Sequence, residues 1–179
     1  RRLRWGSATA LGTRTEGQEL ALRQLRSIEL ASTHGLDILD VQEPSSVGAI
    51  TVEISIDCAG IETRGDGILL HGRERFDISI PNDYPYAYPN VTTRHARWAG
   101  TPHVQWRCQP CLYLAPTVEW LPADGMYGYV ERLLSWLEHA AAGQLDPEDA
   151  PLHPPVAYTT PGAPLIIPRV DTPSVSTDP

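Results

Sequence analysis

Apolar residues recur every three or four positions in two stretches of the sequence, as they do on the buried face of an amphipathic helix. The first stretch begins at Thr15, where Gln18 stands at the spacing of a capping box, and ends at Gly35. The second begins after Asp124, the expected N-cap, and continues to Ala141. The pattern therefore predicts one helix early in the chain and another late in it.

Four shorter stretches between these helices have the composition and alternation of β-strands. The clearest spans residues 49–57, where isoleucine and valine alternate with polar residues as in a half-buried strand. The others span residues 36–43, 68–81 and 90–95. The order of helix, four strands and helix predicts an α+β fold, in which the helices pack against a four-stranded antiparallel meander.

Proline and aromatic residues interrupt the periodic pattern in two further places. Residues 84–121 have no sustained period, and a loop of that length is uncommon unless it is functional. Nine of the 17 prolines lie in residues 147–179. We therefore expect an irregular N-terminal segment (1–14), a folded domain (15–146) and an extended Pro-rich linker or tail (147–179).

The charge balance excludes some classes of function. The chain has 22 acidic and 14 basic residues, a net charge of −8, which disfavours nucleic-acid binding. It has no apolar run of the about 20 residues that span a membrane and no signal-peptide pattern. Its three cysteines are too few for a disulfide scaffold, so we expect a reducing, cytoplasmic location. All 14 basic residues are arginine, and lysine is absent.

The unpatterned segment also contains the residues best suited to chemistry. His103, Cys108 and Cys111 lie within 14 residues, Thr101 to Leu114. They could form a zinc site with Cys58 or His95 as a fourth ligand. A single Cys-x-x-Cys pair without a second pair is weak evidence for such a site, and we expect no metal. The alternative is a single nucleophilic cysteine on the loop surface.

The order and spacing of several short motifs resemble those of ubiquitin-conjugating enzymes. Residues 84–89 read Tyr-Pro-Tyr-Ala-Tyr-Pro, and residues 101–103 read Thr-Pro-His, where the family has His-Pro-Asn. Cys111 follows His103 by eight residues, the spacing of the family's catalytic cysteine, and Trp-Leu-Pro at 120–122 precedes the second helix. The resemblance covers about residues 15–145 and is closest to bacterial members encoded with, or fused to, ThiF-like activating enzymes.

The resemblance implies a ubiquitin-conjugating-enzyme-like fold with a long active-site loop and a crossover helix. It also implies that Cys111 receives a ubiquitin-like modifier from an activating enzyme as a thioester. The modifier would then pass to an amine or another nucleophile on a protein substrate, without a cofactor, and an anti-phage system is an expected setting. The alternative is an inactive relative that only binds a modifier or partner.

Two departures from the family pattern affect the expected mechanism. Thr101 replaces the family's histidine, and His103 replaces the asparagine associated with the oxyanion. We assign His103 to the catalytic site as a hydrogen-bond donor or general base, with simple packing as the alternative. The Gln105 side chain and loop amides are other candidate oxyanion donors. Cys108 is either a bystander or the partner of Cys111 in a reversible disulfide.

Overall fold

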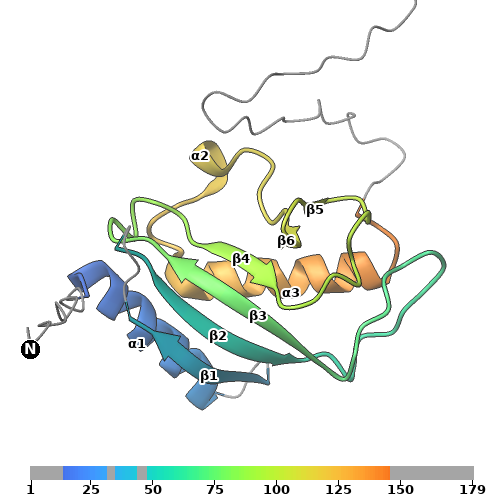
Figure 1. Cartoon of the computed structure of the whole chain (residues 1–179), viewed down its shortest axis with the longest axis horizontal. Helices are drawn as coiled ribbons and strands as arrows, with labels where there is room; N and C mark the ends of the chain where they lie inside the picture. Colours follow the sequence, from blue (N-terminus) through green and yellow to red (C-terminus); the bar gives the residue numbers. More distant parts are fainter. Residues whose placement is uncertain (1–13, 32–34, 44–47, 146–179) are drawn as a thin grey trace, which may run out of the picture. The chain divides into compact units, whose positions relative to one another are not determined.

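The computed structural model describes residues 14–31, 35–43 and 48–145. The predicted tail (147–179) and nearly all of the predicted N-terminal segment (1–14) lie outside these ranges. The elements, shown in Figure 1, are α1 (Glu16–Ala31), β1 (Leu36–Gln42), β2 (Ile50–Asp57), β3 (Arg73–Ile80), β4 (Asn90–Thr93), β5 (Val104–Gln105), β6 (Gln109–Pro110), α2 (Pro116–Glu119) and α3 (Gly125–Ala141). The predicted α+β order of helix, four strands and helix is confirmed.

Strands β1 to β4 form one antiparallel sheet in sequence order, so the predicted meander is correct. Two strands are shorter than expected. Residues 68–72 do not extend β3, because the Ile68 amide donates to Ala140 O at the end of α3 and Gly72 O accepts the Cys58 amide. Strand β4 ends at Thr93, whose hydroxyl donates to the carbonyl of His95 in the turn that follows.

The hydrophobic core lies between this sheet and the two long helices. Alternate residues of β2 and β3 are fully buried and meet the apolar faces of α1 and α3 in one cluster. The strand contribution is Ile50, Val52, Ile54, Ile56, Phe76, Ile78 and Ile80, and the helical contribution includes Leu22, Leu25, Met126, Leu133 and Leu137. The core thereby fixes α1 and α3 relative to the sheet, from which the unpatterned segment (84–121) continues.

The two helices begin in different ways. In α1 the predicted capping box is present: the Gln18 amide donates to Thr15 Oγ1, and the Thr15 amide donates to Gln18 Oε1. At α3 the expected Asp124 cap is wrong, because Asp124 has helical backbone angles and its side chain makes no capping hydrogen bond. The Met126 amide instead donates to Gln24 Oε1 of α1 at 3.0 Å.

The segment that follows β3 contains the one cis peptide bond of the described residues, between Tyr84 and Pro85. The carbonyl of Pro85 accepts a hydrogen bond from the indole of Trp120 at 2.7 Å. This contact joins the start of the unpatterned segment to its end. Within the described ranges, no helix is both long and apolar enough to cross a bilayer.

Candidate functional site

The centre of the site is a short hairpin that lies beside β4 (Figure 1). Val104 pairs with Pro110, and Gln105 pairs with Gln109. The turn uses the left-handed region at two residues that are not glycine, Arg107 (φ 67°) and Cys108 (φ 57°). Such backbone persists only where its surroundings hold it. Here the Thr93 amide donates to Cys108 O at 2.9 Å, which ties the turn to β4.

The hairpin brings the two sequence-predicted site residues together through the backbone. The Cys111 amide donates to the carbonyl of His103 at 2.8 Å, so these residues face each other across the base of the hairpin. His103 also has left-handed backbone (φ 59°). The position of Cys111 is therefore set by strand pairing rather than by a free loop.

The Cys111 thiol is half-buried and has two polar neighbours. It donates to the carbonyl of Tyr113 at 3.3 Å, and the Gln105 side-chain amide donates to the sulfur at 3.5 Å. Burial raises the pKa of the Cys111 thiol, the hydrogen bond from Gln105 opposes this, and the negative charge of Glu119 adds to it. The Cys111 thiol is therefore protonated at neutral pH.

Glu119 and Arg132 hold the chain that follows the cysteine. Glu119 Oε1 accepts the amides of Leu114 (2.9 Å) and Ala115 (2.7 Å), and its Oε2 pairs with Arg132 at 2.8 Å. Arg132 also donates to the carbonyl of Leu112 at 3.3 Å. One ion pair between α2 and α3 thus restrains the backbone from the residue after Cys111 to the start of α2.

The charge of Glu119 is maintained by these contacts. Partial burial tends to raise the pKa of the carboxyl, but the Ala115 amide and the Arg132 guanidinium outweigh it and lower the pKa below the usual value. Glu119 is consequently ionised throughout the neutral range.

Aromatic rings pack around Tyr113, two residues after Cys111. The Tyr113 ring lies 6.2 Å from the rings of Tyr88 and Trp120 and 6.3 Å from that of Tyr129. The Arg132 guanidinium lies over the Tyr113 ring at 4.4 Å. This packing explains the burial of Tyr113, whose carbonyl receives the thiol, and it gives the loop a rigid support.

Comparison with known proteins shows the family to which the chain belongs. The sequence profile of prokaryotic E2 family A matches residues 36–167, which is most of the chain. The chain belongs to prokaryotic E2 family A. Among solved structures, human ubiquitin-conjugating enzyme E2 G1 matches with 19% identity and a TM-score of 0.50, over 70% of this chain and 98% of that one. This match shows the fold. A search of curated proteins gave no match.

The zinc arrangement considered for this E2-family chain has no counterpart in the part of the chain that the structure describes. No three His, Cys, Asp or Glu side chains there form a group that could hold a metal ion. Cys58 is buried at the end of β2, where burial and then the Glu74 charge raise its pKa to about 11. His95 contacts the buried carboxylate of Glu74 at 3.2 Å. All three cysteines are free.

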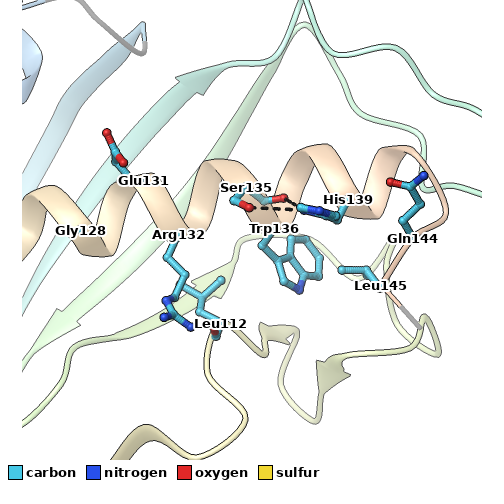
Figure 2. Close-up of a pocket in the computed structure, with 9 residues that line it drawn as sticks. All are labelled: Leu112, Gly128, Glu131, Arg132, Ser135, Trp136, His139, Gln144 and Leu145. Carbon is cyan, nitrogen blue, oxygen red and sulfur yellow. Dashed lines mark hydrogen bonds between the residues drawn. The ribbon is translucent and has the colours of Figure 1, made fainter. Parts of the chain in front are cut away.

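A groove of about 530 Å³ runs along α3 beside the loop of this E2-family domain (Figure 2). Figure 2 shows the Leu112 and Arg132 side chains next to each other at one end and Leu145 near Trp136 at the other. Its lining residues are Leu112, Gly128, Glu131, Arg132, Ser135, Trp136, His139, Gln144 and Leu145. The groove is open and partly polar. One of its lining residues, Leu112, directly follows Cys111 in the sequence.

Sequence reasoning missed the ion pair of Glu119 with Arg132 and the contact of Gln105 with the sulfur. Glu119 and Arg132 are 13 residues apart on different helices, so no helical spacing indicates the pair. Gln105 was a candidate only for the oxyanion. Its contact with Cys111 follows from the pairing of residue 105 with residue 109. That register becomes known only from the structure, so the sequence alone does not indicate the contact.

Proposed function

We propose that this domain is a bacterial conjugating enzyme that carries a ubiquitin-like modifier as a thioester on Cys111. The observation that carries the proposal is the position of this thiol. The hairpin holds it next to Leu112, which lines the groove, and a side-chain amide donor lies 3.5 Å from its sulfur, in a chain of prokaryotic E2 family A. Cys58, by contrast, is almost completely buried and its thiol donates to the carbonyl of Ile56, as in an inert structural cysteine.

The proposed reaction has two acyl-transfer steps. The Cys111 thiol first loses its proton to a solvent base. The thiolate attacks the thioester carbonyl of the modifier, a new C–S bond forms, and the sulfur of the activating enzyme leaves as a thiolate. In the second step a nucleophile, such as an amine, attacks the same carbonyl, Cys111 leaves as a thiolate, and the amine proton passes to solvent. ATP is consumed upstream, so neither step needs a cofactor.

We keep His103 as a proposed contributor to catalysis. Its carbonyl accepts the Cys111 amide, which means that this amide is already used in the hairpin and is not free to bind the oxyanion of the intermediate. Another group must then supply that donor, and the imidazole of His103 is a candidate beside the other loop amides. His103→Ala should slow charging by about tenfold or more if it does so.

The proposed partners are those that the family resemblance implies. They are a ubiquitin-like modifier, a ThiF-like activating enzyme that is fused or separate, and a protein substrate. The proposed setting is the bacterial cytoplasm and a role in anti-phage defence. Three cysteines are too few for a disulfide scaffold, which supports a reducing compartment.

The deciding experiment is a charging assay with the activating enzyme, a ubiquitin-like modifier and ATP. We expect an adduct that thiol reductant removes. Cys111→Ala should abolish it, and Cys108→Ala, the matched control three residues away, should leave it intact. Normal charging of Cys111→Ala would exclude Cys111 as the nucleophile. A domain that binds the modifier but never forms the thioester would establish the rival function, an inactive binding module.

A further inference from the structure

Within the described residues of the hairpin, the side chain of Gln105 donates a hydrogen bond to the Cys111 sulfur. Gln105 pairs directly with Gln109, so Cys111, two residues further on, is its diagonal neighbour. Diagonal neighbours in an antiparallel pair are about 7–8 Å apart, a span that long side chains bridge. The contact is therefore a consequence of strand register and of the length of the glutamine side chain.

The two polar neighbours of the sulfur have opposite effects on its two charge states. The Tyr113 carbonyl accepts the thiol hydrogen and so stabilises the protonated form. Once the proton has left, the same carbonyl oxygen faces a negative sulfur and destabilises it. The Gln105 amide is a donor, and its interaction strengthens when the sulfur becomes charged.

The surroundings provide little other support for a thiolate. Half-burial removes water from the sulfur, and the nearby ionised Glu119 repels a second negative charge. The Arg132 guanidinium is paired with Glu119 and lies over Tyr113. Of the two polar neighbours of the sulfur, only the Gln105 amide can therefore stabilise its negative charge.

We propose that the Gln105 carboxamide is the donor that stabilises the Cys111 thiolate, both as the attacking group and as the leaving group of acyl transfer. The role in catalysis rests on the proposed function. No additional reactant is involved, because the proton is exchanged with solvent and the C–S bonds form and break as in the two steps above. The role is distinct from the oxyanion, which develops on the modifier's carbonyl oxygen and requires a separate donor.

The test is the pH profile of Cys111 alkylation by iodoacetamide in the full chain, followed by mass spectrometry of the peptide that contains Cys111. Gln105→Met keeps the size of the side chain and removes the donor. We expect the midpoint to rise by about one pH unit, a tenfold change in the ionisation constant. The plateau rate at high pH should rise about threefold, because a more basic thiolate is a better nucleophile.

Gln109→Met is the matched control, because Gln109 lies opposite Gln105 in the hairpin and its amide donates to Asn90 Oδ1 instead. Its midpoint should equal that of the wild type. The sign of the change separates a chemical role from a structural one. If Gln105→Met merely opened the hairpin, Cys111 would lose its burial and its midpoint would fall.

An unchanged or lower midpoint in Gln105→Met overturns the inference. Alkylation needs no partner protein, so this result is independent of the charging assay. If the midpoint rises in Gln105→Met but the wild-type chain forms no thioester in the charging assay, the inference about Gln105 is retained and the proposed function is refuted. In the charging assay itself, Gln105→Met should slow thioester formation about threefold at neutral pH, since the lower thiolate fraction is partly offset by higher nucleophilicity.

Discussion

At the scale of the residue, Glu119 shows how one carboxylate can shape a loop. Its Oε1 accepts hydrogen bonds from two successive amides, Leu114 in the loop and Ala115 just before α2. Its Oε2 pairs with the Arg132 guanidinium of α3. Two amides at the start of a helix have no intrahelical partner, so the contact also satisfies donors that would otherwise depend on water. Glu119 thereby ties the loop after Cys111 to α2 and α3.

Glu119→Gln tests this role through its pH dependence. The pKa of Glu119 is lowered in the folded state, so its stabilisation is complete above the usual value near 4.5 and is lost as the pH falls through the lowered pKa. At pH 7 we expect a loss of about 1 kcal/mol, or about 2–4 °C in Tm. The difference from wild type should shrink below pH 4.

The measurement is thermal unfolding of both proteins between pH 3 and pH 8, with Glu138→Gln as the control on the exposed side of α3. A difference that stays constant across this pH range would mean that the charge of Glu119 does not stabilise the fold.

Single residues are also where sequence reasoning reached its limit. Cys111 could be singled out by its distance from His103, because family motifs are linear patterns. The contacts of its thiol could not, since they depend on a pairing register between strands of two residues each. No hydrophobic alternation can specify a register over so short a length.

At the scale of the element, helix α3 depends on α1 for its first turn. Gln24 Oε1 accepts both the Met126 amide, at 3.0 Å, and the hydroxyl of Tyr84, at 2.8 Å. Tyr84 is almost completely buried, so its hydroxyl has little access to water. One side chain therefore joins two helices and the segment that follows β3.

Gln24→Ala should destabilise the domain by about 2 kcal/mol, because it leaves a buried hydroxyl and a helix-start amide without their acceptor. The measurement is urea unfolding followed by circular dichroism. Arg23→Ala, at an exposed neighbouring position of α1, is the control and should leave the midpoint unchanged. Equal midpoints for the two variants would mean that water replaces Gln24.

The long elements and the short strand β4 could be predicted from the sequence, and the other short elements could not. Helices α1 and α3 and strand β2 each have enough residues to show a period. Elements β5, β6 and α2 have two to four residues and no period, so the segment that contains them was expected to be a loop. The prediction of Asp124 as the N-cap is wrong for a different reason. The side chain that accepts the Met126 amide instead, Gln24, is distant in sequence and adjacent only after folding.

At the scale of the whole molecule, the absence of lysine bears on the proposed chemistry. The 179 residues contain no side chain with a primary amine. A carrier that transfers its modifier to amines therefore has no lysine of its own to modify within this sequence.

Introducing a lysine tests whether amines are acceptors. Trp106 is 95% exposed in the hairpin turn, next to Gln105, and Leu30 is 84% exposed on α1. After charging, Trp106→Lys should form at least about tenfold more reductant-resistant adduct than Leu30→Lys, because its amine is held near Cys111. Gel shift and peptide mapping measure it. A normal thioester with no such adduct in either variant would indicate that the acceptor is not a simple amine.

The free side of β1 has a consequence for the behaviour of the domain in concentrated solution. Strand β1 is the first in the sheet order, and within the described residues no strand pairs with its outer side. Its pairing with β2 shifts between Ile38 and Asp40, and two of its seven residues are aspartates. An irregular, acidic edge is a poor template for a further strand. The sheet is thereby protected from edge-to-edge aggregation.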